Sequence, residues 1–436
     1  MMQFTEPPVL PPPLQNGLGL YLNLTMTNPT RHPWPGYPHP TTTTTSDTNS
    51  MEQLLIHCAT AIDGNDATLA QQILWVLNNI APPDGDSTQR LTSAFLRALI
   101  SRASRLNILS SSSSSLAVTT THRFPILDLA SFIDLTPWHR FGFSASNAAI
   151  LDAVQTYPVV HVLDLSVTRC MQMPTLIDAF ASRAEGPPYL KLTILEPLLD
   201  APPTIELSYE ELGLRLVSFA RSRNVAMEFR VVPSSPSDGF VSLIEHMQQQ
   251  QRLQSESEAL VVNCQMMMHY VAEGEGHSSS LSSLRSDFLK SMRRLEPTLV
   301  TLVDEDADFT SDGLIGRLRA AFNYLWIPYD AVDTFLPRGS ERRRWYEAEI
   351  GWRVENVVAQ EGVGRVERLE SRGRWAQRMR AAGFKAVGFG EEAVAEVRGL
   401  LEEHAAGWGL KKEEEDHLVL TWKGHNVVFA TVWVPS

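Results

Sequence analysis

The chain has 436 residues, of which 43% are hydrophobic, and its formal net charge is −13. A chain of this length can bury a large core, and its acidity disfavours binding to naked nucleic acid by broad neutralisation of phosphates. We expect neither a secretion signal nor a membrane span, because the N-terminus lacks basic and apolar regions and no apolar stretch approaches roughly 18 residues. The cysteines Cys58, Cys170 and Cys264 lack metal-ligand spacing, which is typical of buried thiols in a reducing compartment.

The N-terminal quarter divides into three parts. Residues 1–50 are rich in Pro, Thr and Asn, which predicts a disordered arm. Residues 51–109 carry three apolar stripes at helical spacing without a sustained heptad, so we expect a helical cap and not a coiled coil. Trp75 lies off the stripe of its helix and is therefore a candidate for contact with the cap or a partner. The serine run that follows predicts a flexible linker over residues 110–123.

Strand-like and helix-like segments alternate after this linker. The strand candidates are residues 159–164, 190–195, 225–232, 259–263 and 298–303. The helical stretches are residues 144–157, 174–184, 208–222, 240–252 and 284–295. This alternation predicts a parallel sheet with helices on both faces.

The C-terminal tail has a different pattern. It predicts a strand, a helix and two successive strands, at residues 383–389, 391–404, 417–422 and 427–434. A hairpin that closes a parallel sheet is the layout of class I methyltransferases. We therefore predict an α/β core over residues 124–436, with a doubly wound, mostly parallel, Rossmann-type sheet and a C-terminal antiparallel hairpin. The helical pattern of residues 312–360 is too long for a simple crossover, so we expect part of it to join the helical cap. The charge run at residues 411–416 predicts a solvated loop.

The loop after the first core strand is unusual for a ligand-binding sheet. The strand ends in Asp164, and residues 165–174 contain no glycine. In a cofactor-binding sheet this loop is rich in glycine, because its backbone N–H groups must approach the ligand closely. Here Cβ atoms, together with Met171 and Met173, would occupy that space. The chain has the scaffold of an enzyme without a usable cofactor loop, which disfavours catalysis.

Polar residues also end two other core strands. In a methyltransferase, an acid such as Glu196 would bind ribose hydroxyls, and a polar tip such as Asn263 would face the substrate. We favour the alternative that Asp164, Glu196 and Asn263 cap helix N-termini and loop amides, which strand-end carboxylates and amides do well.

Other polar residues favour structural roles. His161 alternates with apolar neighbours on its strand, so we expect a buried, hydrogen-bonded histidine in preference to a catalytic base. His269 has no Asp or Ser in motif spacing, which leaves a catalytic triad unsupported. The segment with Arg365, Glu367 and Arg368 predicts a partly buried ion network in preference to a phosphate site.

Several of these segments carry a family resemblance. Residues 160–164 resemble the VHIID signature of GRAS-domain proteins, a family of plant transcriptional regulators. Further matches follow in the expected order, at residues 260–264, 328–330, 336–338, 356–362 and 365–368 and at Trp375, Trp422 and Trp433. The resemblance covers residues 51–436, and residues 168–178 are most similar to the SHORT-ROOT branch and its SCARECROW-like members. Ala348 and Tyr329 depart from the family's usual arginine and phenylalanine.

The resemblance implies a nuclear regulator, with the cytoplasm as a second location, that has no catalytic residues, cofactor or metal. It implies dimerisation through the helical cap, with itself or with another GRAS protein of the SCARECROW type. It also implies indirect recruitment to DNA by C2H2 zinc-finger transcription factors of the INDETERMINATE-domain type, and no membrane contact. The candidate interface residues are Leu69, Ile73, Trp75, Arg398 and Glu402. The structural residues of the family motifs are His161, Asp164, Asn263, Arg365, Glu367, Arg368, Trp375, Trp422 and Trp433.

Two alternative functions stay open at this point. The first is an S-adenosylmethionine-dependent small-molecule methyltransferase, which the glycine-free loop disfavours. The second is direct sequence-specific DNA binding, which the net charge disfavours but which a local basic face would permit.

Overall fold

The computed structural model describes residues 44–106, 123–197, 201–251, 257–273, 283–413 and 417–436. Most of the expected arm and of the expected linker therefore lies outside the described residues. Helix α1 (Thr44–Asp63) begins within the segment expected to be disordered. The arm boundary at residue 50 was wrong, because the helix already includes the residues from Thr44 onward.

A nine-stranded mixed sheet forms the centre of the α/β part. Its strands in spatial order are β5 (Met227–Ser234), β3 (Tyr189–Pro197), β2 (Val159–Ser166), β6 (Glu258–Gln265), β7 (Leu299–Glu305), β11 (His425–Pro435), β10 (Leu418–Trp422) and β9 (Trp408–Lys412), and β8 (Phe384–Val387) also pairs with β11. The first five strands are parallel, and β11 runs antiparallel to β7 and to β10. An antiparallel strand inserted beside parallel ones is the methyltransferase-like layout that the tail predicted.

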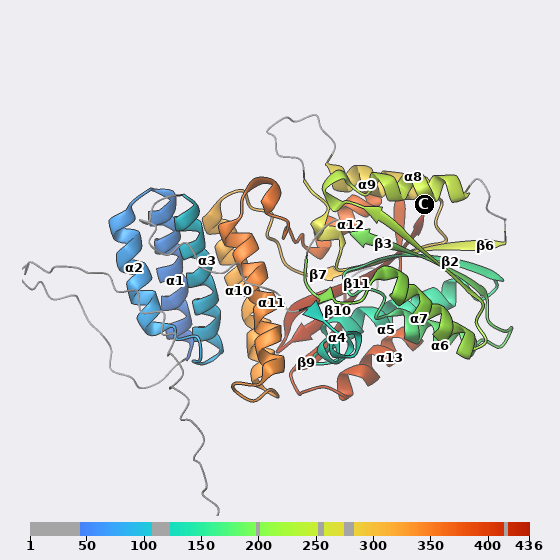
Figure 1. The fold of residues 1–436 in the computed structure, drawn as a ribbon, viewed down its shortest axis with the longest axis horizontal. Coiled ribbons are helices and arrows are strands. Elements are labelled where there is room, and N and C mark those ends of the chain that lie inside the picture. The colour runs from blue at the N-terminus through green and yellow to red at the C-terminus, as the bar shows by residue number, and fades with distance from the viewer. Residues whose placement is uncertain (1–43, 107–122, 198–200, 252–256, 274–282, 414–416) are drawn as a thin grey trace, which may run out of the picture. The chain divides into compact units, whose positions relative to one another are not determined.

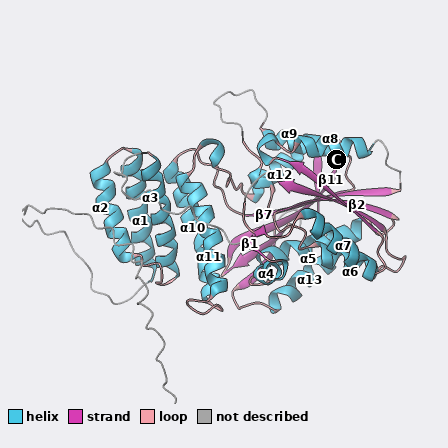
Figure 2. Cartoon of the chain, in the orientation of Figure 1, coloured by secondary structure: helices cyan, strands magenta, loops and turns pink. Residues whose placement is uncertain are grey.

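Helices cover both faces of this sheet (Figure 2). One face carries α5 (Pro137–Ala153), α6 (Met173–Ala181), α7 (Tyr209–Ser222) and α13 (Glu391–Glu402). The other carries α8 (Val241–Gln251), α9 (Leu284–Arg293) and α12 (Arg372–Ala381). Because both faces are covered, β2 is buried along almost its whole length, as expected for a strand of a parallel sheet. Across the described ranges, the helices are too short or too polar to cross a membrane.

A helical bundle lies beside the sheet (Figure 1), and we call it the helical cap. It consists of α1, α2 (Ala67–Ile80), α3 (Ser87–Arg105), α10 (Leu314–Asp333) and α11 (Glu341–Ala359). Asp86 and Gln89 form a capping box that starts α3. Arg90 of α3 donates to Glu347 of α11 (2.9 Å) and to Asp333 of α10 (2.7 Å). These contacts join helices that are far apart in the sequence.

Four short elements were missed by the sequence analysis. Strand β1 (Arg123–Phe124) pairs in parallel with β4 (Thr204–Ile205), and α4 (Ile126–Ile133) follows β1. The fourth is β9, which pairs with β10 and contains Lys411 and Lys412. The expected loop at residues 411–416 was therefore wrong in its first part, because exposed lysines are compatible with the free edge of a sheet. Residues 414–416 lie outside the described residues.

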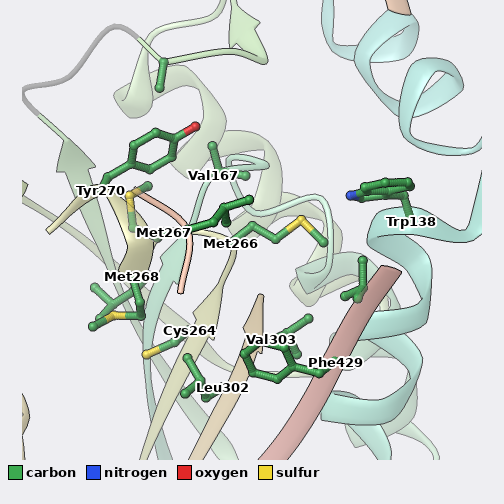
Figure 3. Close-up of a cluster of buried hydrophobic side chains, with 14 of the residues drawn as sticks. Trp138, Val167, Cys264, Met266, Met267, Met268, Tyr270, Leu302, Val303 and Phe429 are labelled. Atoms are coloured by element: carbon green, nitrogen blue, oxygen red, sulfur yellow. The ribbon is translucent and has the colours of Figure 1, made fainter. Parts of the chain in front are cut away.

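The methionines after β6 belong to the core. Met266, Met267 and Met268 are at most 4% exposed, and Figure 3 shows them among other buried side chains, with Cys264 and Val167 nearby. Their unbranched, polarisable side chains suit irregular gaps. They therefore do not form an exposed contact surface.

Candidate functional site

The loop after β2 occupies the position where a cofactor-binding sheet has its glycines. Arg169 and Cys170 both have left-handed backbone conformations, with φ of 53° and 64°. Glycine is the usual residue in this region, because a Cβ atom is strained there. The Cys170 side chain is buried and contacts Asp164, and the Arg169 guanidinium lies 5.5 Å from the Tyr209 ring centroid. The loop thus fills the space that a glycine loop would leave open.

Asn263, at the end of β6, is the hub of a buried polar network beside this loop. Its Nδ2 donates to Asp164 Oδ1 (2.7 Å) and to Gln172 Oε1 (2.9 Å). Its Oδ1 accepts from Thr301 Oγ1 (2.8 Å) and Gln265 Nε2 (3.0 Å). Asn263 is 0% exposed, so four neighbouring side chains replace the water that its amide would otherwise bind.

The network continues through other side chains, at Ser146, Asn147, Ser166 and Thr175. The network joins α5, β6 and β7 with the loop that follows β2. Burial raises the pKa of Asp164, although hydrogen bonds from Ser166 and Asn263 oppose this shift. The helix-capping role expected for Asp164 and Asn263 was wrong, because side chains from several elements converge on them instead of backbone amides. Glu196 is half-buried at the end of β3.

A second buried cluster lies where the helical cap meets the sheet. Glu305, at the end of β7, accepts hydrogen bonds from Trp138 Nε1 (2.9 Å) and Arg353 Nη1 (2.9 Å). Arg353 of α11 also lies 3.5 Å from Glu367, whose carboxylate accepts from Tyr270 (2.9 Å). Burial opposes the charge of Arg353, but Glu305 and Glu367 raise its pKa well above the usual value.

His269 extends this cluster beneath the sheet's carboxyl edge. Its Nδ1 lies 2.8 Å from Asp304 Oδ1, and its Nε2 lies 3.9 Å from Glu367. Burial lowers the pKa of His269, yet Asp304 outweighs it and the net shift is upward. The histidine therefore has an acidic partner that sequence spacing did not reveal. The described ionic partners of His269 are the carboxylates of Asp304 and Glu367, so the group is a buried ion cluster.

Family-motif residues near the C-terminus surround a fully buried arginine, Arg285. Its Nη1 lies 3.2 Å from Glu370, and its guanidinium lies 5.4 Å from the Trp375 ring centroid. It also donates to the backbone oxygen of Arg368 (2.9 Å). Arg365 donates to a backbone oxygen as well, that of Phe309 (3.1 Å). Of the two motif arginines, Arg365 thus donates to a backbone oxygen, and Arg368 accepts a hydrogen bond at its own backbone oxygen. The nearby carboxylates of Glu367 and Glu370 pair instead with Arg353 and Arg285.

The remaining motif residues have defined partners. His161 lies 2.8 Å from Thr193 Oγ1 and 3.4 Å from Glu258, and burial lowers its pKa to about 4. Trp422 and Trp433 are fully buried, and they donate to Asp330 (2.7 Å) and to Thr431 (2.9 Å) respectively.

The candidate interface residues fall into two groups. On α2, Leu69 is 43% and Trp75 is 64% exposed, but Ile73 is only 8% exposed. Its place among the interface candidates was therefore wrong, because Ile73 packs inside the cap. On α13, Arg398 and Glu402 are both exposed. The structure does not bring the two groups together.

Sequence reasoning missed Asp304, Glu305, Arg353 and Arg285. Charged residues directly after a buried strand were the available signal for the first two. No local pattern links Arg285 or Arg353 to partners that are distant in the chain. Among the described residues, no group of three or more side chains could hold a metal ion.

Comparisons with known proteins agree with this architecture. A model described as the GRAS domain family matches residues 51–434. The chain is 61% identical over 414 residues to Scarecrow-like protein 32 of Arabidopsis thaliana, covering 94% of this chain and 98% of that protein. It is 30% identical to Protein SHORT-ROOT of Arabidopsis thaliana, covering 88% of this chain and 73% of that protein. The crystal structure of SCL7 in Oryza sativa matches with a TM-score of 0.69 at 22% identity, over 88% of this chain and 99% of that one. The last match confirms the predicted fold class.

Proposed function

The chain belongs to the GRAS domain family of plant transcriptional regulators, in its SHORT-ROOT and SCARECROW-like branch, and we propose that it acts in the nucleus as a scaffold for protein–protein contacts. Within this role it dimerises through the helical cap, with a second copy or with a SCARECROW-type GRAS protein. C2H2 zinc-finger factors of the INDETERMINATE-domain type then recruit it to DNA.

The filled strand-tip site carries this proposal. The Asn263 network and the buried Cys170 side chain occupy the region in which a methyltransferase would hold its cofactor. When side chains of the chain itself fill the cofactor region of the sheet, the outer surface of the protein becomes the place where it can bind other molecules. This supports a contact-based role over small-molecule chemistry.

The outer face of α2 supports dimerisation through the cap. The helix contains no charged residue over its 14 positions, although several of them face solvent. Exposed Trp75 and Leu69 lie among amide side chains on this face. The cores of protein–protein interfaces are likewise enriched in tryptophan and depleted of charged residues.

The charge of the chain supports recruitment by a partner. At −13 it repels phosphates, whereas a C2H2 helix enters the major groove and brings its own base contacts. The exposed α13 residues Arg398 and Glu402 offer a candidate surface for such a partner.

The experiment that tests the scaffold role measures association through the cap. We would change Leu69 and Trp75 together to Asp and measure the mass by light scattering, alone and with a SCARECROW-type partner. The expected result is loss of binding to the SCARECROW-type partner and a lower mass of the protein alone, with an unchanged melting temperature. Leu127→Asp is the matched control, because Leu127 is an exposed leucine (77%) on α4. Equal association of the unmodified chain, the double variant and the Leu127→Asp control would refute the cap interface.

A further inference from the structure

The sheet has a free edge at β5, at the opposite end of the strand order from the strands that contact the cap. Among the described strands, β5 pairs with β3 alone. The Ala226 oxygen accepts from Leu190 of β3 (2.9 Å). Since alternate residues of a strand direct their backbone groups to opposite sides, Met227, Phe229 and Val231 direct theirs to the free edge. Pro233 falls on the same side, and proline is tolerated in a sheet where its missing N–H faces an edge.

The side chains of this edge carry one charge of each sign. Glu228 and Arg230 lie on one face of the strand, are 33% and 37% exposed, and pair with each other at 2.6 Å. On the other face, the Phe229 ring lies so close to Gly213 of α7 that a Cβ there would meet it at 2.3 Å. Helices α7 and α8 flank the edge on opposite faces of the sheet. Next to Gly213, Leu214 is 73% exposed.

We propose that β5 pairs with β5 of a second copy of this chain, antiparallel and about a two-fold axis at Phe229. In this register Phe229 faces its own counterpart, and Met227 faces Val231 of the second copy. These residues are the ones whose backbone groups point outward, so they form the hydrogen-bonded pairs of the new ladder.

The same register places Glu228 opposite Arg230 of the second copy, and Arg230 opposite its Glu228. These are the non-hydrogen-bonded pairs, in which side chains come closest and opposite charges stabilise. A two-fold axis at Glu228 would instead place two glutamates together, and one at Arg230 would place two arginines together. Of these three registers, only the axis at Phe229 pairs opposite charges, and a two-fold contact of this kind is self-complementary.

This surface is separate from the cap interface of the proposed function. The cap meets the sheet at β7 and β11, through Glu305 and Val427. Both surfaces can be occupied at once, so a cap-linked pair could join a second pair through β5. The proposal stands whether or not the cap dimerises.

The test uses the full chain with Leu69→Asp and Trp75→Asp, so that cap association does not interfere. We expect sedimentation to show a concentration-dependent dimer of this parent protein. Arg230→Glu and Glu228→Arg, each added to the parent, should raise the dissociation constant at least tenfold with unchanged melting. Arg294→Glu is the charge-matched control, since Arg294 is exposed at the end of α9, and it should dimerise like the parent.

Mixing the two charge variants distinguishes pairing between copies from the pairing within one strand. The Arg230→Glu chain has two acids on β5 and the Glu228→Arg chain has two arginines, so neither can form its internal pair. A mixed pair nevertheless has opposite charges at both cross-strand positions, and an equimolar mixture should form a one-to-one dimer. A monomeric parent, a dimer that is indifferent to Arg230→Glu, or a mixture that stays monomeric would overturn the proposal.

Discussion

Arg353 and Glu305 form a bidentate ion pair that joins the helical cap to the sheet. Both guanidinium Nη atoms of Arg353, on α11, donate to the carboxylate of Glu305, at the end of β7. The side chains are only 14% and 6% exposed, so little water competes for either charge. Trp138 of α5 adds a third donor to the same carboxylate. Three elements from different parts of the chain are thus held at one carboxylate.

Removing the arginine should destabilise the fold strongly. Arg353→Met leaves the Glu305 charge buried without its main partner, and breaking a buried pair costs about 3–5 kcal/mol. Urea unfolding would measure this loss. Arg342→Met, an exposed arginine on the same helix, should change the free energy of unfolding by no more than about 0.5 kcal/mol. Similar values for the two variants would show that the pair does not hold the cap to the sheet.

Asn263 should be intolerant of an apolar replacement. Asn263→Leu keeps the number and branching of heavy atoms but removes the hydrogen bonds that Asp164, Gln172, Thr301 and Gln265 make with the Asn263 amide. Each orphaned buried group costs about 1–3 kcal/mol, so we expect a loss of several kcal/mol in thermal or urea unfolding. Asn79→Leu on the exposed face of α2 is the control and should be nearly neutral. A well-folded, fully stable Asn263→Leu protein would contradict the network's structural role.

The sequence predicted the fold better than it predicted the site. Strand β2 was recognisable because Val159, Val160 and Val162 are β-branched and lead into a loop, and the tail hairpin followed from two apolar runs around Gly424. These signals are local. The partners of Asn263 come from β2, the loop after β2, β6 and β7, and they meet only once the sheet has formed. A capping role was the best local interpretation, and tertiary packing overrode it.

The exposure of side chains on α2 could also be predicted only in part from the sequence. Helical periodicity placed Leu69 and Ile73 on one stripe, but the structure leaves Leu69 43% and Ile73 8% exposed. The width of a stripe does not reveal which of its positions the neighbouring helices cover, and in the cap they cover Ile73 more fully than Leu69. Only the exposure of Trp75, which lies off the stripe, followed from the sequence.

The stability of the chain should fall as the pH falls from about 6.5 to about 4 because of His161. Burial is the main cause that lowers its pKa to about 4, although Glu258 favours the charged form, and an unfolded histidine titrates near 6.5. Between these values the unfolded state binds more protons, so acid favours unfolding, with a full effect of about 3 kcal/mol below both pKa values.

His161→Gln tests this linkage, because glutamine stays neutral and can still bond to Thr193. We expect the free energy of unfolding of this variant to change less with pH across the window. His139, whose pKa burial also lowers to about 4, should leave part of the slope in place. Identical slopes in the two proteins would mean that His161 is accessible to protonation in the folded state.

S-adenosylmethionine should not stabilise the chain. A ligand at 100 times its dissociation constant would add about 2.7 kcal/mol to the free energy of unfolding, which a melting curve detects readily. The same measurement should be made on Cys170→Gly. Glycine adopts a φ of 64° without strain, and the substitution removes one side chain from the filled site. A clear rise in the melting temperature of the unmodified chain would favour the methyltransferase alternative over the scaffold.

The last prediction concerns how the chain reaches DNA. Alone, it should bind duplex weakly at physiological salt, because its charge of −13 repels phosphates and so little counterion release drives binding. With a C2H2 zinc-finger partner, a gel shift should show a ternary complex whose base contacts come from the finger.

Arg398→Ala and Glu402→Ala on α13 should weaken that complex without unfolding the sheet, since both side chains are exposed. Trp75→Ala on α2 is the matched control and should leave zinc-finger binding intact, as should removal of residues 1–43. If the α13 variants bind the finger as well as the unmodified chain does, the partner surface lies elsewhere. If the chain alone binds duplex with nanomolar, sequence-selective affinity at physiological salt, the recruitment model fails and the protein reads DNA directly.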